Sequence, residues 1–536
     1  MAPWVIERIP YESTGHFGPW VRDYLSDAES LRPFFHRRPE RQSLIDQAAE
    51  RSDFPMERRR VLVEVLREQY ARCSISVEGL LQTNLDRLEQ PDSRTVVTGH
   101  QLNLFGGPLY VLYKLAHIVA QARELNASGP GFHTIPVFWL ATEDHDYAEV
   151  DHVHFRAQPL RAEGAPLGAV GRRVLGDLES LISGLETLLG TGKRAAAAGA
   201  LLRRAYRPGQ TWAEAMRILA HEWFGAEGLV ILDADDARLK RFFVPVLEQE
   251  LRNSSYSTAL QHTTQALSES YSAQAFVRPI NVFYLGNDIR SRIEREGEGY
   301  RTTEGGYSWS ESTLVEELHA HPERFSPNVL LRPLYQETIL PNLAYTGGGG
   351  ELAYWFQLRS AFETAGIPMP VLILRQSFLW VLGSASKIWA HTGVSAEEWF
   401  VERSRFIRHR LAEHSPLDLA LKKPRKALDA VFEGLYALAA QTDESMERAV
   451  EAERMRHQKG LHRLEGKLIR AEKRRLGERV LQWERAHAQL FPQSGLQERF
   501  DSYWDLYAHL GPQTPARVLE AIAPFEPAFL LIREPQ

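Results

Sequence analysis

Four ionisable residues in a row follow a short apolar segment of the chain. The segment spans residues 135–140, and the four residues are Glu143, Asp144, His145 and Asp146. Like charges repel one another, and burial beside an apolar strand raises the pKa of a carboxyl group, so this cluster needs compensation. A metal ion, a substrate amine or basic side chains could each provide it.

Three interpretations of this acidic cluster stay open. Its carboxylates could ligate Mg²⁺ together with nucleotide phosphates. Asp144, His145 or Asp146 could act as a general base, with Glu143 contributing to binding. The structural alternative is a solvated helix N-terminus, where acidic side chains favour the helix dipole.

A second segment, which begins at Thr98, has the composition of an anion-binding loop. Its glycines let the backbone approach a ligand, and the helix that follows offers its N-terminal N–H groups to an anion. His100 could donate a hydrogen bond to phosphate or carboxylate oxygens, which makes it a fourth catalytic candidate. The segment is neither a Walker A nor a Gly-x-Gly-x-x-Gly motif, and a simple turn is the alternative. The candidate binding residues here are Thr98, Gly99, Gln101, Gly106, Gly107, Tyr110 and Lys114.

A third segment contains four consecutive glycines, at positions 347–350. Such a run is costly in conformational entropy and is a poor choice for packing alone. It precedes a predicted helix that begins near Glu351, so it forms a second candidate anion site, and Glu351 could instead simply cap that helix. The candidate binding residues in and around this segment are Asn328, Glu337, Gly348, Gly349, Gly350, Glu351 and Trp355.

Arginines beside the predicted strands are candidate carboxylate clamps, because a guanidinium group can bind a carboxylate through two parallel hydrogen bonds. Arg332 and Arg375 are the stronger candidates, and Arg290 and Arg292 are the weaker ones. Either pair could instead form only surface salt bridges.

The residues above follow short apolar segments that alternate with helical patterns. A strand, a loop, a helix at 109–125 and a second strand form a βαβ unit, which implies parallel strands and a right-handed crossover. The sequence therefore predicts an α/β fold with a Rossmann-like, doubly wound parallel sheet. Ligands of such sheets bind beyond the carboxyl ends of the strands, so we expect the three segments to converge on one pocket. The predicted strands are residues 94–99, 135–140, 228–233, 280–285 and 369–374.

Changes in composition divide the chain into six parts. The long helical pattern after residue 384 has apolar residues at three- and four-residue steps, typical of a coiled coil or of paired helices. It could form either an intramolecular hairpin or a dimer interface. The predicted parts are a helical segment at 1–90, the first core part at 91–155, an inserted connecting domain at 156–212, the second core part at 213–383, a helical coiled-coil domain at 384–500 and a segment returning to the core at 501–536.

Composition narrows the functional classes. The chain has 536 residues and a net charge of −6, so nothing predicts broad affinity for nucleic acid or for an anionic membrane. One cysteine, Cys73, excludes an internal disulfide and a multi-thiolate metal site, and we interpret it as a buried structural thiol. No apolar run approaches the length of a membrane span and no signal-like segment opens the chain, so we expect a cytoplasmic protein.

An ordered set of motifs resembles the cysteine-adding enzyme family of bacillithiol biosynthesis. The similarity covers essentially the whole chain. Two positions differ from the usual pattern: His100 stands where the family often has Gln, and the glycine run lacks a frequent Pro. The motifs are Thr98–Gln101, Gly107–Tyr110 with Lys114, Pro136–Trp139, Glu143–Asp146, Phe325–Val329, Arg332-Pro333, Gln336-Glu337, Gly350–Trp355, Leu490–Pro492 and Leu496–Arg499.

The resemblance implies a Rossmann-like core with inserted segments and a coiled-coil domain that supports a homodimer. It also implies a ligase that joins the carboxyl group of cysteine to the amine of glucosaminyl-malate. A carboxylate is a poor acyl donor until it is activated, most simply by ATP, with Mg²⁺ as a possible companion. Fold analogy with class I synthetases and nucleotidylyltransferases favours an acyl-adenylate over an acyl-phosphate.

Two alternatives belong to other functional classes. A nucleotidyltransferase or a metal-dependent hydrolase would use Glu143–Asp146 as a metal site. A non-catalytic scaffold would assemble partners through the coiled coil, and substitution of Asp144 or His145 would leave its function intact.

Overall fold

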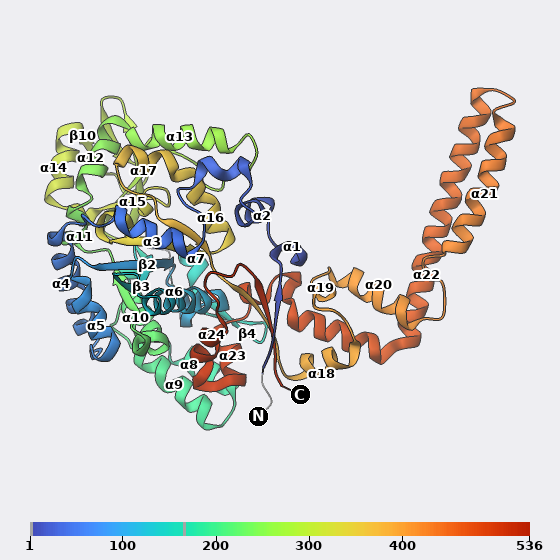
Figure 1. The fold of residues 1–536 in the computed structure, drawn as a ribbon, viewed down its shortest axis with the longest axis horizontal. Coiled ribbons are helices and arrows are strands. Elements are labelled where there is room, and N and C mark those ends of the chain that lie inside the picture. Colours follow the sequence, from blue (N-terminus) through green and yellow to red (C-terminus); the bar gives the residue numbers. More distant parts are fainter. Residues whose placement is uncertain (1–3, 165–167, 536) are drawn as a thin grey trace.

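The computed structural model of the protein describes residues 4–164 and 168–535. Residues 1–3 and 536, at the ends of the first and last predicted parts, and residues 165–167, within the predicted insertion, lie outside the described residues. The chain folds into an α/β core, an antiparallel β-sheet beside that core, and a long helical arm (Figure 1).

A five-stranded parallel sheet forms the centre of the core, in the order β13-β12-β2-β3-β6. The predicted Rossmann-like sheet is thereby confirmed. One of the five predicted strands is wrong, because residues 280–285 belong to another sheet. The fifth strand of the parallel sheet is β12, which the sequence did not predict. The strands are β2 (Ser93–His100), β3 (His133–Leu140), β6 (Val230–Asp233), β12 (Asn342–Gly347) and β13 (Val371–Leu374).

Helices cover both faces of this sheet. The crossovers from β2 to β3 and from β3 to β6 move along the sheet towards the β6 edge, and the connection from β12 to β13 moves towards the opposite edge. Because such crossovers are right-handed, α6 and α10 lie on one face and α17 lies on the other. In Figure 1, α6 and α10 lie below β2 and β3, and α3 and α17 lie above. The helices are α3 (Arg41–Glu50), α4 (Met56–Arg72), α5 (Gly79–Leu88), α6 (Leu109–Ala127), α10 (Trp212–Phe224) and α17 (Arg359–Ala365).

The segment predicted as the fourth core strand is β7 of an antiparallel sheet with the order β10-β9-β8-β7-β11. Short turns connect β7 to β8 and β8 to β9, and β11 pairs with the other edge of β7, so the apolar residues of β7 lie in this sheet and not in the parallel sheet. This insertion comprises α12 (Val244–Asn253), α13 (Ser255–Leu267), β7 (Val282–Gly286), β8 (Ile289–Glu296), β9 (Gly299–Thr302), β10 (Ser308–Ser310), α14 (Glu311–Ala320) and β11 (Phe325–Pro327).

The region between β3 and α10, most of which falls in the insertion predicted at 156–212, contains a short helix, a β-hairpin and two longer helices. The two longer helices, α8 and α9, pack against each other. The elements are α7 (Tyr147–Val150), β4 (His152–Phe155), β5 (Gln158–Arg161), the 3₁₀ turn Val170–Arg172, α8 (Glu179–Leu189) and α9 (Lys193–Ala205).

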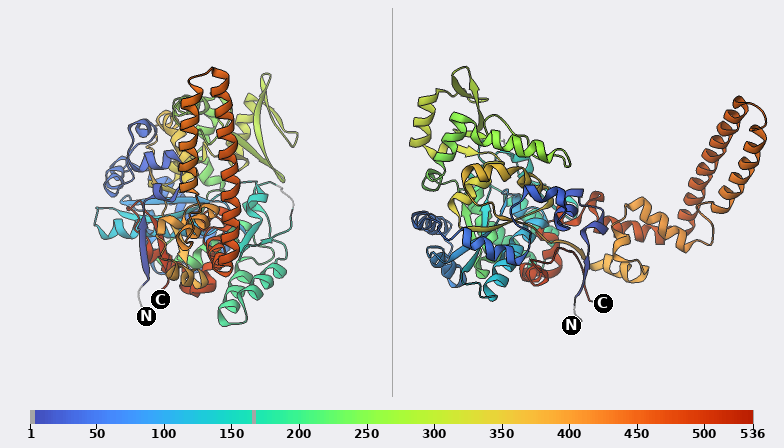
Figure 2. Two further views of the ribbon diagram at one scale, coloured as in Figure 1. Left: turned by 90° about the vertical axis from the view of Figure 1, so that its right-hand side faces the viewer. Right: turned by 45° about the horizontal axis from the view of Figure 1, so that its top comes forward.

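The C-terminal part contains a three-stranded sheet and the arm. β15 (Phe529–Arg533) lies between β1 (Val5–Ile9), which is antiparallel to it, and β14 (Ser377–Val381), which is parallel to it. β1, near the start of the chain, and β15, near its end, therefore lie in one sheet. The arm ends in an intramolecular hairpin of α21 and α22 that projects away from the core (Figures 1 and 2). Its helices are α18 (Gly383–Thr392), α19 (Ala396–Trp399), α20 (Arg403–His414), α21 (Lys422–Ala439) and α22 (Glu444–Leu490).

Seven short helices complete the fold and connect the larger elements. They are α1 (Tyr11–Thr14), α2 (Pro19–Leu25), α11 (Ala237–Arg241), α15 (Arg332–Ile339), α16 (Gly349–Trp355), α23 (Tyr503–Leu510) and α24 (Thr514–Ala521). Among the described residues, no helix combines the length and the apolar character that crossing a bilayer requires.

Candidate active site

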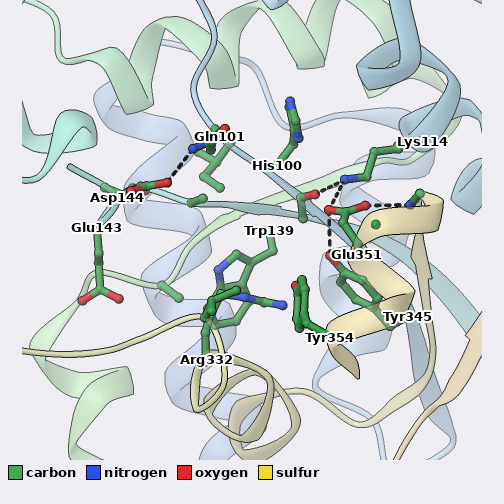
Figure 3. Close-up of a pocket in the computed structure, with 18 of the residues that line it drawn as sticks. His100, Gln101, Lys114, Trp139, Glu143, Asp144, Arg332, Tyr345, Glu351 and Tyr354 are labelled. Atoms are coloured by element: carbon green, nitrogen blue, oxygen red, sulfur yellow. Dashed lines mark hydrogen bonds and ion pairs between the residues drawn. The ribbon is translucent and has the colours of Figure 1, made fainter. Parts of the chain in front are cut away.

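A cavity of about 600 Å³ lies at the carboxyl ends of the central strands. All three segments singled out in the sequence contribute to its wall, so the expected convergence is observed. Figure 3 shows His100, Glu143, Asp144, Glu351 and Arg332 around it. The sequence-derived candidates that line the cavity are Gly99, His100, Gln101, Tyr110, Lys114, Glu143, Asp144, Arg290, Asn328, Arg332, Gly348, Gly349, Gly350, Glu351 and Arg375.

Three candidates of the segment that begins at Thr98 lie away from the cavity and shape its backbone instead. The Thr98 hydroxyl donates a hydrogen bond to the Thr346 carbonyl at 2.6 Å and so links β2 to β12. Gly106 and Gly107 have φ of 91° and 68°, and a Cβ atom on either would lie 2.5 Å from a neighbouring side chain. These two glycines therefore make a tight turn before α6.

Lys114 and Glu351 form a buried ion pair at one end of the cavity. Lys114 Nζ lies 2.7 Å from Glu351 Oε1 and also donates to the Gly99 carbonyl. Glu351 Oε2 accepts the Gly348 N–H at 2.7 Å. Burial disfavours the charge on Glu351, but Lys114 and this N–H outweigh it and lower the pKa of the carboxyl. The side chain of Glu351 therefore caps α16, and the predicted anion site at the glycine run already holds an internal carboxylate.

His100 lies beside this pair, with its ring 5.2 Å from that of Tyr110 in an edge-to-face contact. Burial, reinforced by the charge of Lys114, lowers the pKa of His100 to about 3. The imidazole is therefore neutral at physiological pH. Within the described part of the chain its Nε2 is buried and lacks a hydrogen-bond partner of normal geometry.

Asp144 is held rigidly at the other end of the cavity. Its Oδ1 accepts the His145 N–H at 2.7 Å, and its Oδ2 accepts Gln101 Nε2 at 2.7 Å. Burial opposes ionisation, but these hydrogen bonds and Arg290 outweigh it and hold the pKa of Asp144 well below its usual range. His145 and Asp146 point outside the cavity and are exposed, although His145 Nδ1 lies 3.1 Å from Arg290 Nη1.

Basic side chains compensate the acidic cluster. Lys240 Nζ contacts the Glu143 carboxylate and lies 2.8 Å from Asp235 Oδ1, while Arg172 binds both oxygens of Asp235 at 2.5 and 2.7 Å. Burial raises the pKa of Glu143, which shares Lys240 with Asp235. Among the residues that the structure describes, no three His, Cys, Asp or Glu side chains are arranged to hold a metal ion.

The arginines differ in how far their hydrogen-bonding capacity is used. Arg375 binds the Glu498 carboxylate at 3.0 and 2.7 Å, so its predicted clamp is engaged within the protein. Arg332 lies over the rings of Trp139 and Tyr345, with its Cζ 5.7 and 5.6 Å from their centroids. Arg332 Nη2 and Arg375 Nε are buried, and neither has a hydrogen-bond partner among residues 4–164 and 168–535. Arg292 lies in β8, paired with Phe283, away from the cavity.

Two other candidates are structural neighbours of the site. Glu337 forms a buried ion pair with Arg51 at 2.8 Å and accepts Asn342 Nδ2 at 2.7 Å. Trp355 is fully buried and stacks on Tyr345, with 4.4 Å between the ring centroids.

Cys73, at the end of α4, is also buried, and burial raises its pKa to about 11, as expected for a structural thiol.

Several lining residues were not named individually as candidates: Trp139, Tyr354 and Arg499, which lie within the family motifs, and Asp235 and Tyr345. The rule that ligands bind beyond strand ends would have found Asp235, because it follows β6 just as Glu143 follows β3. Tyr345 belongs to β12, which was not predicted. Arg499 reaches the cavity from the C-terminal part, and nothing local in the sequence indicates that approach.

Comparisons with known proteins cover nearly all of the chain. The family model "Bacillithiol biosynthesis BshC, N-terminal Rossmann-like domain" matches residues 5–376, and "Bacillithiol biosynthesis BshC, C-terminal coiled-coil domain" matches residues 378–534. Relatives named "Putative cysteine ligase BshC" include proteins of Flavobacterium johnsoniae and Christiangramia forsetii, both 36% identical, and of Salinibacter ruber, 33% identical. The alignments cover 98%, 98% and 92% of this chain and 99%, 98% and 92% of the respective relatives.

Proposed function

The chain belongs to the BshC family of bacillithiol biosynthesis, and from that premise we propose that it is a ligase that joins L-cysteine to the amine of glucosaminyl-malate. The product is an amide between the cysteine carboxyl group and the sugar amine. One observation carries the proposal: a single cavity combines an acidic end at Glu143 and Asp144 with an end that contains Arg332 and Arg375.

The acidic end suits the amine substrate. An amine reaches the enzyme as an ammonium ion, which a fixed carboxylate attracts. Asp144 is such a carboxylate, because its two oxygens are held by hydrogen bonds and it stays ionised. Holding both reactants in one cavity turns a bimolecular reaction into an effectively unimolecular one.

The opposite end suits the groups that activate the cysteine carboxyl. We propose ATP as the co-substrate, because a carboxylate needs activation before an amine can attack it. The buried unpaired atoms Arg332 Nη2 and Arg375 Nε, together with Arg499, are donors that would hold phosphate or carboxylate oxygens. With no three-ligand metal site among the described residues, a Mg²⁺ ion would take most of its ligands from the phosphates and water.

Two further parts of the proposal concern assembly and the alternative chemistry. The hairpin of α21 and α22 carries exposed apolar side chains suited to a homodimer contact, namely Val431, Leu435, Leu438, Met446, Met455 and Leu464. A nucleotidyltransferase or hydrolase with a metal at Glu143–Asp146 is less favoured, because Lys240 already contacts the Glu143 carboxylate.

The test uses the purified protein with cysteine, glucosaminyl-malate and ATP, with mass spectrometry of the products. We expect the thiol-containing amide together with either AMP and pyrophosphate or ADP and phosphate, which separates adenylate from phosphate activation. Asp144→Asn should weaken binding of the aminosugar while the fold is retained. A product formed without nucleotide consumption would exclude ATP activation, and unchanged turnover in Asp144→Asn would favour a non-catalytic role for the acidic end.

A further inference from the structure

The two neighbouring carboxylates of the cavity have different surroundings. Asp144 accepts hydrogen bonds from a backbone N–H and from a Gln101 amide, both at 2.7 Å. Glu143 accepts none of this kind: within the described residues, its one close polar partner is the ammonium group of Lys240. The carboxylate of Asp144 is therefore fixed as an acceptor, whereas Glu143 has the capacity to take up a proton.

Lys240 lies behind Glu143 and away from the substrate. Its side chain is 2% exposed and it is not part of the cavity wall, whereas Glu143 is. Asp235 Oδ1 at 2.8 Å and the Glu323 carbonyl at 3.3 Å hold the ammonium group in place. Arg172 fixes Asp235 from the other side with two hydrogen bonds. The position of Lys240 is thus set by Asp235, which also lines the cavity, and by the Glu323 carbonyl behind it.

We propose that Glu143 accepts the proton of the substrate amine, and that Lys240 is the positioning residue that keeps Glu143 ionised and ready to accept it. The proton transfer rests on the proposed ligase function. The positioning role of Lys240 rests on the contacts alone.

The charges that face Glu143 come from five elements and partly cancel. Burial raises its pKa, Lys240 and Arg290 lower it, and Asp235 raises it, with a net upward direction. The pKa of Asp144 is lowered. Two adjacent carboxyl groups with pKa values pushed apart divide the roles of ion binder and proton acceptor between them. The ionisable groups that surround Glu143 are Asp144 on its own loop, Asp233, Asp235 and Lys240 around α11, Arg172 on the 3₁₀ turn, Arg290 on β8 and Tyr335 on α15.

The chemical step balances as follows. The substrate ammonium gives one proton to the Glu143 carboxylate and becomes a neutral amine. The nitrogen lone pair attacks the activated carbonyl carbon of cysteine, the carbon–nitrogen bond forms, and the bond from that carbon to the phosphate oxygen breaks with its electron pair leaving on the oxygen. The nitrogen then loses its second proton to water, and Glu143 returns its proton to solvent before the next turnover.

The kinetic test compares pH profiles of amide formation in the wild type and four full-length variants. In Lys240→Met the acid limb of kcat/KM should move up by about 1 to 3 pH units, because an adjacent cation is lost. In Lys240→Arg the acid limb should stay near its wild-type position. In Arg172→Met, which removes the partner of Asp235 and not of Glu143, the acid limb should move less than in Lys240→Met. Glu143→Gln should lower kcat by about 10²- to 10⁴-fold. A loss by the same factor at every pH in Lys240→Met would overturn the positioning role.

A second measurement does not depend on turnover. The infrared difference between the wild type and Glu143→Gln, followed over a pH titration, reports the ionisation of the Glu143 carboxyl group alone. When both proteins also carry Lys240→Met, the Glu143 carboxyl group should stay protonated to a higher pH. An unchanged titration would overturn the role of Lys240. If the wild type makes amide but Glu143→Gln keeps more than a tenth of the rate, proton acceptance by Glu143 is wrong while the ligase function stands. If the wild type makes no amide, the ligase function and the proton transfer both fall, and the infrared shift alone decides the role of Lys240.

Discussion

The cavity has a buried lysine–glutamate pair at each end, and the two pairs differ in what else they contact. At one end Lys114 is paired with Glu351 alone, and Glu351 also caps α16 through the Gly348 N–H. At the other end Lys240 is shared between Glu143 and Asp235. The pKa of Glu351 is lowered and that of Glu143 is raised. The same two residue types therefore give a permanent structural anion in one place and a group with affinity for protons in the other.

The largest expected effect comes from breaking the structural pair. Glu351→Gln leaves the ammonium group of Lys114, which is 1% exposed, without its counter-ion, and should cost about 3 to 5 kcal/mol of unfolding free energy. Glu143→Gln is the matched control, because Lys240 keeps Asp235, and it should cost about 1 kcal/mol. Chemical denaturation of both variants measures the difference. Equal losses would show that the two pairs are energetically alike.

Unfolding free energies measured over a pH series should distinguish the two ends of the cavity, because His100 and Glu143 change stability with pH in opposite directions. His100 has a folded-state pKa below its unfolded value of 6.5, so the stability that its neutral form contributes is present above pH 6.5 and is lost as the pH falls towards 3. His100→Gln should remove about 1 to 2 kcal/mol of the loss between pH 6.5 and pH 5, measured by denaturation at each pH. His117, which has a similarly lowered pKa, is retained in both proteins and cancels in the difference.

Glu143 should act in the opposite direction. Its pKa is raised in the folded state, so the fold loses stability as the pH rises from the ordinary carboxyl value of 4.5 through the raised value. Glu143→Gln should therefore remove a loss of stability that sets in as the pH rises above 4.5, whereas His100→Gln removes a loss that sets in as the pH falls below 6.5. Curves that change in the same direction for both variants would contradict the distinction between the two ends.

The smallest expected effect concerns the glycine run at the structural end. Gly350 has open space around the position of a Cβ atom and an ordinary helical conformation, so Gly350→Ala should stabilise the protein by about 0.4 to 1 kcal/mol. At Gly347 a Cβ atom would lie 3.0 Å from the Tyr345 ring and 3.2 Å from Glu351 Cβ, so Gly347→Ala should destabilise. The midpoints of thermal unfolding of the two variants measure the difference. A lower midpoint in Gly350→Ala than in the wild type would mean that all positions of the run need glycine.

The sequence predicted the four strands with runs of β-branched or apolar residues, β2, β3, β6 and β13. It missed β12, whose residues Asn342–Gly347 include Asn, Tyr, Thr and Gly and lack the expected aliphatic pattern. It placed β7 in the wrong sheet, because an apolar run of that length indicates a strand but not its partner. The local sequence therefore indicates that a strand forms, but the strand with which it pairs depends on the rest of the fold.

The same limit applies to the site. The ends of β2 and β3 indicated His100, Glu143 and Asp144, since these follow directly from the strand pattern. The partners that set their chemistry are remote: Lys240 lies nearly a hundred positions after Glu143, and Glu498 lies 123 positions after Arg375. A sequence shows that an acidic cluster needs compensation, but only the fold shows which cations provide it.

The sheet formed by β1, β15 and β14 also sets an order of events during synthesis. Glu7 and Arg533, which are hydrogen-bonded across β1 and β15, lie 526 positions apart. At about 5 to 20 residues per second, a ribosome needs roughly half a minute to two minutes to make the chain between them. Throughout that interval β1 has to wait without its partner strand, so the closing of this sheet is a late step that follows the assembly of the core.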